Sequence, residues 1–173
     1  HRLIKTLAEY VPPVLITKHI PPHFSAAFAE RLNKLFPFEI KEAAEGDKIR
    51  PNQILIAPGG KQMGLKKEGS QLVISIKENT IVNGFQPSVE YLFKSVEAIC
   101  PQKTIAIMLT GIGSDGAAAM KSLRNAGART IGQSKETCVV YGMPKAAFEA
   151  GALEFVVPLE EISAKIIEIS NSL

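Results

Sequence analysis

The stretch TIAIMLTGIGSDGAAAMKSLRNAG, residues 104–127, gives the clearest indication of the fold class. An apolar run leads into a glycine-rich turn and then into an alanine-rich segment with helical spacing, an order that predicts strand, turn and helix. Gly111, Gly113 and Gly116 spell the pattern G-x-G-x-x-G, with Asp115 inside it. The turn therefore either cradles the phosphates of a dinucleotide or presents a carboxylate.

Segments on both sides repeat the alternation of strand and helix. Short apolar runs predict strands, and segments with apolar residues every three or four positions predict helices. Repeated strand–helix steps imply an α/β fold with a mostly parallel sheet and helices on both faces, whereas residues 71–76 alternate with period two, as in a small antiparallel hairpin. The predicted strands lie within 13–19, 38–43, 53–58, 71–76, 104–109, 128–134 and 153–157, and the predicted helices within 24–36, 87–100, 116–126, 143–151 and 159–170.

Composition limits the possible partners and compartment. The 173 residues suit one domain, and a net charge of +3 spread along the chain indicates neither nucleic-acid binding nor membrane insertion. The two cysteines, Cys100 and Cys138, show no disulfide or C-x-x-C spacing, which favours a reducing compartment. No segment has the signal-peptide pattern or the roughly 20 apolar residues of a membrane span. We therefore expect a cytoplasmic protein.

Asp115 weakens the dinucleotide interpretation of the glycine turn. A carboxylate at the start of a helix competes with an anionic pyrophosphate for the positive end of the helix dipole. The fingerprint also needs an acidic residue at the end of the next strand, where this sequence has Gln133. A structural alternative for Asp115 is the N-cap of the helix, which would satisfy free backbone N–H groups. All three interpretations remain open at this point.

His19 is the second candidate, because it falls at the carboxyl end of the predicted strand of residues 13–19. Ligands of parallel sheets bind at that edge, although a histidine there can also be merely structural. His23 lies four residues on, but two intervening prolines keep the pair off one helical face, so a metal site is not expected. His19 and Asp115 could meet at the sheet edge as the base and the orienting acid of a catalytic triad.

Other reactive or charged side chains have simpler interpretations. Cys138 could act as a nucleophile, but no basic neighbour is evident that would lower its pKa. Lys61, Lys66 and Lys67 are expected in a solvated loop.

Four blocks of the sequence together resemble one family. They are KHIPPHFSAAFAERLN, IVNGFQPSVEYLF, LTGIGSDGAAAM and ETCVVYGMPKAAFEAGA, and in this order they are similar to the catalytic domain of the chemotaxis protein-glutamate methylesterases (CheB). The resemblance covers essentially the whole chain. It implies a Rossmann-like α/β domain with a Ser-His-Asp triad and no cofactor. The implied activity is hydrolysis of glutamyl methyl esters on the cytoplasmic helices of chemoreceptors, with release of methanol, and deamidation of receptor glutamines in many members.

The resemblance also assigns roles to particular residues. It makes His19 the general base and Asp115 the acid that orients it. Backbone N–H groups of the turn at Gly111, Ile112 and Gly113 would line the pocket and stabilise an oxyanion. The family usually has methionine at the position of Ile112, a difference that should alter the packing of the pocket slightly.

The nucleophile has no counterpart in this sequence. The family serine stands in a turn similar to GASTGG after the first strand, a few residues before the segment that HRLIKTLAEY resembles, and no such turn occurs here. We expect residues 1–173 to be a methylesterase catalytic domain whose serine and first strand lie upstream of His1, with no receiver domain in this chain although the family commonly carries one. An inactive relative, a non-catalytic receptor-binding domain and a dinucleotide-binding module are the alternatives.

Overall fold

The structure is a computed structural model that describes residues 2–5, 7 and 11–172. These residues form two compact units, one from residues 11–95 and the other from residues 2–5, 7 and 96–172. Each unit has its own parallel sheet, and each is described separately below.

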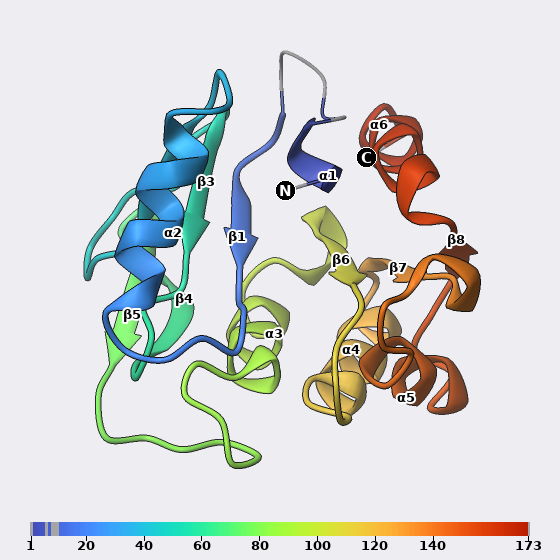
Figure 1. Cartoon of the computed structure of the whole chain (residues 1–173). Helices are drawn as coiled ribbons and strands as arrows, with labels where there is room; N and C mark the ends of the chain where they lie inside the picture. Colours follow the sequence, from blue (N-terminus) through green and yellow to red (C-terminus); the bar gives the residue numbers. More distant parts are fainter. Residues whose placement is uncertain (1, 6, 8–10, 173) are drawn as a thin grey trace. The chain divides into compact units, whose positions relative to one another are not determined.

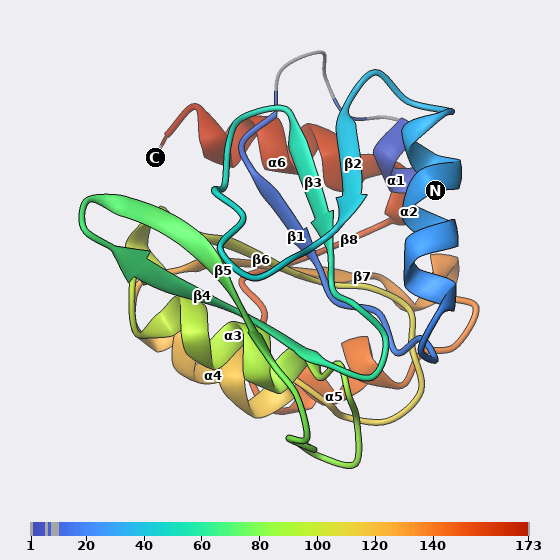
Figure 2. The same ribbon diagram turned by 90° about the vertical axis from the view of Figure 1, so that its left-hand side faces the viewer.

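The first unit is built on the parallel sheet β1-β3-β2, formed by β1 (Val14–Ile16), β3 (Gln53–Ile56) and β2 (Glu39–Glu42). Ile54, Leu55 and Ile56 of the central strand β3 are at most 1% exposed, which explains why this strand is continuously apolar in sequence. Helix α2 (Phe24–Asn33; Figure 1) packs on the edge strand β2, which Figure 2 shows beside it.

An antiparallel hairpin completes the first unit. Strands β4 (Gln62–Glu68) and β5 (Gln71–Lys77) pair along their full length (Figure 2), which confirms the predicted hairpin. The expected lysine loop is wrong, because Lys66 and Lys67 lie within β4. Lys66 forms ion pairs with Glu45 and Glu68, at 2.6 and 2.9 Å. The charged residues at the end of β4 break the alternation of apolar and polar residues that indicates a strand, so the sequence pattern did not predict β4.

The second unit contains the parallel sheet β6-β7-β8, formed by β6 (Ile105–Met108), β7 (Arg129–Gln133) and β8 (Phe155–Val157). Helices α4 (Ala117–Asn125) and α5 (Met143–Glu149) cover one face, and α6 (Ile162–Ser170) covers the other, as Figures 1 and 2 show from two directions. Ile131, Ile162 and Ile169 form a buried core between β7 and α6.

Shorter elements connect this framework. Helix α3 (Val89–Glu97) buries the apolar face that its sequence predicts, with Val89, Leu92, Phe93 and Val96 all at most 9% exposed. Helix α1 (Arg2–Lys5) contacts the 3₁₀ turn η3 (Leu159–Glu161). Two further 3₁₀ turns are η1 (Pro101–Lys103) and η2 (Lys135–Thr137).

The expected α/β class, with parallel strands, covering helices and a small antiparallel pair, is confirmed. Within the described ranges, no helix has the length and apolar character that crossing a membrane requires.

Candidate active site

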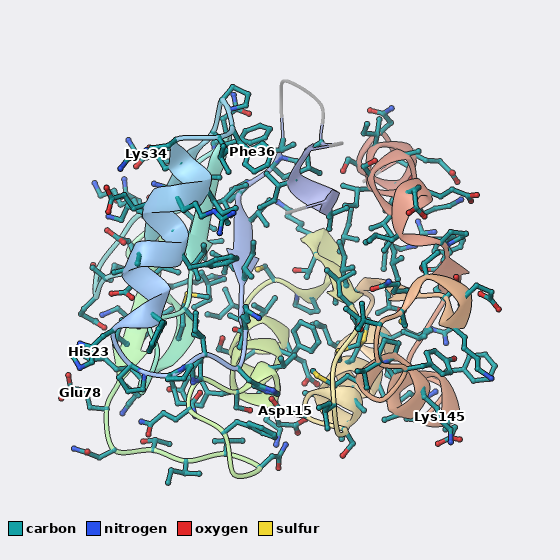
Figure 3. The ribbon with its side chains drawn as sticks, in the orientation of Figure 1. His23, Lys34, Phe36, Glu78, Asp115 and Lys145 are labelled. Atoms are coloured by element: carbon teal, nitrogen blue, oxygen red, sulfur yellow. The ribbon has the colours of Figure 1, made fainter. Side chains whose placement is uncertain are left out.

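His19 lies three residues beyond β1, at the carboxyl end of that strand. Its half-buried imidazole stacks on the ring of Phe85, with the ring centroids 3.7 Å apart and the planes 5° from parallel. The first unit thus brings together the predicted histidine and an aromatic residue from the loop after β5. His23 is exposed and precedes α2, and Figure 3 shows it and Lys34 at opposite ends of that helix.

The loop that carries His19 packs against two glycines that follow β3. A Cβ atom at Gly59 would lie 2.3 Å from the carbonyl oxygen of Pro21, and one at Gly60 would lie 2.8 Å from the ring of Pro22. The Gly59 N–H also donates to the hydroxyl of Ser25 at 2.8 Å. Because any side chain at Gly59 would collide with backbone, the two glycines let the histidine loop lie directly on the end of β3.

The loop that carries Phe85 is a tight turn held by a buried glutamine. Val82 and Phe85 exchange backbone hydrogen bonds of 3.2 and 2.9 Å around Asn83 and Gly84, both at positive φ, as in a type I′ hairpin. The amide of Gln62, which is fully buried, donates to the carbonyl oxygens of Phe85 and Thr80, both at 2.9 Å.

Asp115 lies in the second unit beside α4 (Figure 3) and is only 2% exposed. The N-cap interpretation of this residue is wrong, because α4 begins at Ala117 and Gly116 occupies the capping position with φ 84°. Gly116 takes that position because glycine adopts a left-handed conformation at little cost. Asp115 is therefore a buried carboxylate just before the helix.

A second loop holds the glycine turn next to Asp115. The Gly111 N–H donates to the carbonyl oxygen of Val140 at 3.1 Å, and the Gly111 carbonyl oxygen accepts from the N–H groups of Gly142 and Met143 at 3.1 and 2.8 Å. A Cβ atom at Gly142 would lie 2.6 Å from that same carbonyl oxygen. Residues 140–143 thus fix the backbone of the turn, and position 142 has no room for a side chain.

The side chain of Gln133 hydrogen-bonds to Thr110, just before the glycine turn. This side chain, 1% exposed, accepts from the Thr110 N–H at 2.9 Å and donates to the carbonyl oxygen of Thr137 at 2.8 Å. A dinucleotide site would need an acidic residue here to bind the ribose. The position instead holds a neutral amide whose oxygen and nitrogen both form hydrogen bonds within the protein, which argues against a dinucleotide-binding site.

Cys138 has the properties of a structural thiol. Burial raises its pKa, and its Sγ donates to the carbonyl oxygen of Gln133 at 3.8 Å. A raised pKa lowers the fraction of nucleophilic thiolate.

The rim of the turn is open and apolar. Ile112 and Val139 are 76% and 90% exposed, and Val140 is 40% exposed. Gly113 has φ 89°, and open space lies where a Cβ atom would be. Among the described residues, no group of three or more His, Cys, Asp or Glu side chains is arranged to hold a metal ion.

Comparison with known proteins identifies the family. The family profile described as CheB methylesterase matches residues 1–166.

The chain belongs to the CheB methylesterase family.

Two curated relatives and one solved structure illustrate the similarity. The protein-glutamate methylesterase/protein-glutamine glutaminase of Bdellovibrio bacteriovorus is 41% identical over 158 residues, covering 91% of this chain and 45% of the relative. A second such protein, from Syntrophomonas wolfei, is 41% identical over 173 residues, covering 100% of this chain and 51% of the relative. The crystal structure of the Thermotoga maritima CheB methylesterase catalytic domain superposes with a TM-score of 0.93 at 34% identity, covering 97% of this chain and 89% of that one. The chain thus spans about half the length of these curated relatives.

Several residues that support the loops of His19 and Asp115 were not predicted from the sequence to do so. The Asn-Gly pair at 83–84 is a recognisable signal for a type I′ turn and could have indicated that residue 85 is held rigidly. The buried glutamines carry no such signal. They are Gln62 and Gln133.

Proposed function

We propose that the complete protein hydrolyses glutamyl methyl esters on methyl-accepting chemoreceptors, releasing methanol, and that it also deamidates receptor glutamines. The observation that carries this proposal is family membership over residues 1–166, together with relatives of about 41% identity that are named for both activities. His19 and Asp115 stand in the two family motifs that carry the base and the orienting acid. The site is proposed to work without a cofactor, in the cytoplasm.

The proposed reaction is acyl transfer through a serine. The family serine, which we place before His1, attacks the ester carbonyl through its Oγ while His19 accepts the hydroxyl proton. His19 returns that proton to the methoxide as the ester C–O bond breaks, so methanol leaves and an acyl-enzyme remains. Water, deprotonated by His19, then attacks the acyl-enzyme, and His19 returns that proton to the serine Oγ as the acyl C–O bond breaks, which releases the glutamyl carboxylate and restores the serine. Asp115 is proposed to accept a hydrogen bond from His19 and so fix its tautomer.

Backbone N–H groups of the glycine turn are proposed to stabilise the oxyanion. The N–H of Gly111 is already bound to Val140, which makes the contribution of Gly111 structural. The N–H groups of Ile112 and Gly113 have no partner among the described residues and lie on the exposed part of the turn, so we assign the oxyanion to them. Donors of this kind each contribute about 10²–10³ in kcat when preorganised.

The exposed apolar side chains around the turn fit the proposed substrate. Ile112, Val139 and Val140 offer an apolar rim on which one face of an amphipathic receptor helix could lie while its glutamyl ester enters the site.

A matched pair of histidine variants tests the proposed function. In the complete protein, His19→Asn should lower kcat for methanol release from methylated receptor by about 10³–10⁴. His23→Asn is the control, because His23 is exposed at φ 72° and asparagine tolerates that left-handed backbone. It should release methanol at the wild-type rate. Normal methanol release by His19→Asn would overturn the proposal.

A further inference from the structure

We infer that Phe85 is a positioning residue for His19 and that buried Gln62 holds it in place. The inference rests on the proposed role of His19 as the general base. It begins from the close, nearly parallel stack of the two rings, 3.7 Å between centroids and 5° between planes.

The stack restricts the orientation of the imidazole. Both nitrogens of His19 lie in the ring plane, so rotation about the Cβ–Cγ bond changes the direction in which each nitrogen can accept or donate a proton. With a phenyl ring at contact distance over one face, such a rotation would drive imidazole atoms into Phe85. Phe85 thereby keeps the proton-accepting nitrogen aimed along one plane, and catalytic rates depend on orientation at this level.

The phenyl ring also suits the charge that His19 carries during the reaction. When His19 takes the serine proton it becomes an imidazolium, and this cation lies over the negative face of the phenyl ring. The interaction exists only after proton transfer, so it favours the intermediate over the resting enzyme. A leucine of similar apolar character has no such face.

Hydrogen bonds fix the backbone around Phe85. The type I′ turn at Asn83 and Gly84 closes a two-residue hairpin between Val82 and Phe85. The Nε2 of Gln62 donates to the carbonyl oxygens of Thr80, which precedes the hairpin, and of Phe85, both at 2.9 Å. The Oε1 of Gln62 accepts from the Ser88 N–H at 2.8 Å.

Gly60 contacts both the loop of Phe85 and the loop of His19. The Gly60 N–H donates to the carbonyl oxygen of Gln86 at 3.0 Å, and Gly60 packs against Pro22 of the histidine loop. The loops that carry His19 and Phe85 therefore share a common support after β3. His19 therefore has a supported backbone and a supported stacking partner, and a catalytic side chain needs such surroundings to keep one orientation.

The first test is spectroscopic and needs no activity. The imidazole C–H signals of His19 and His23 in the labelled complete protein can be assigned by their disappearance in His19→Asn and His23→Asn. In the wild type, ring current from Phe85 should shift the His19 signals upfield of those of exposed His23. Phe85→Leu should remove that shift, and Phe85→Tyr should keep it. A wild-type His19 without an upfield shift would overturn the inference even if both Phe85 variants failed to fold.

The second test is kinetic. Phe85→Leu should lower kcat for methanol release by about 10- to 100-fold with little change in KM, because orientation rather than substrate binding is lost. Phe85→Tyr should restore most of the rate. Ile81→Ala, on the same loop and 70% exposed, is the matched control and should behave as wild type. If the wild type depends on His19 but Phe85→Leu keeps its kcat, the inference fails and the proposed function stands; if the wild type releases no methanol, the proposed function fails.

Discussion

Replacing Gly142 by alanine should displace the turn that leads to Asp115. The new Cβ would lie 2.6 Å from the Gly111 carbonyl oxygen and 3.1 Å from the Gly113 nitrogen. Both are backbone atoms, so no change of rotamer relieves the overlap, and the turn must retreat by at least a few tenths of an ångström. The φ of Gly142 is negative, so the cost arises from the contact rather than from a left-handed conformation.

The size of the effect follows from that overlap. Overpacking of this kind costs about 1–3 kcal/mol, and the stiffer unfolded chain of an alanine variant returns about 0.4–1 kcal/mol. We therefore expect Gly142→Ala to lower the free energy of unfolding by about 1–2 kcal/mol, which is a Tm lower by about 2–8 °C for a chain of this size. Because misplacement of catalytic groups by 1 Å can cost about 10²-fold, the smaller displacement here should lower kcat about tenfold.

Thermal unfolding and methanol release by the complete protein measure both effects. Gly111→Ala is the matched control, because its Cβ would meet the Sδ of Met143 at 2.5 Å, at the end of a flexible side chain that can move aside. The control should lose less stability and less activity than Gly142→Ala. A Gly142→Ala protein with wild-type Tm and kcat, or a more damaging Gly111→Ala, would refute the argument that backbone contact sets the cost.

Three further variants probe the second unit. Gln133→Met should lower the free energy of unfolding by about 1–2 kcal/mol, because the Thr110 N–H loses its acceptor at 2.9 Å; an unchanged Tm would contradict this. The Arg129 guanidinium, 2.7 Å away, lowers the pKa of the Glu154 carboxyl, so this pair stabilises the fold at neutral pH and is lost as the pH falls through the lowered pKa. Glu154→Gln should therefore lower Tm at neutral pH, with the difference from wild type vanishing in acid; a difference independent of pH would count against the ion pair. Cys138→Ala should release methanol at the wild-type rate, since burial raises the pKa of this thiol, and a large loss of kcat would restore Cys138 as a candidate nucleophile.

The sequence predicted the fold wherever apolar periodicity reports burial. Strand β3 is apolar throughout because it is central in a parallel sheet, and α3 buries the face that its spacing indicates. The prediction failed at β4, where Lys66 and Lys67 suggested a loop. β4 is a strand because it pairs with β5, and this pairing cannot be inferred from the order of apolar and polar residues within β4.

The positions of the candidate residues in the fold could be predicted from the sequence, but the contacts that hold their loops could not. His19 could be placed at the end of a strand and Asp115 in a turn, because strand ends and glycine turns have local signals. The N-cap alternative for Asp115 required knowing whether the helix starts at residue 116 or 117, and boundaries of this kind are set by backbone geometry. Gln62 acts on groups 18 to 26 residues away, and such contacts depend on the completed fold.

His19 and Asp115 are proposed to act as one catalytic unit, and a double-mutant cycle measures their coupling most directly. kcat/KM for methanol release from methylated receptor is compared among the wild-type complete protein, His19→Asn, Asp115→Asn and the double variant. Residues of one triad are strongly non-additive, so the double variant should be about as impaired as His19→Asn alone. Losses that simply multiply in the double variant would contradict this proposal.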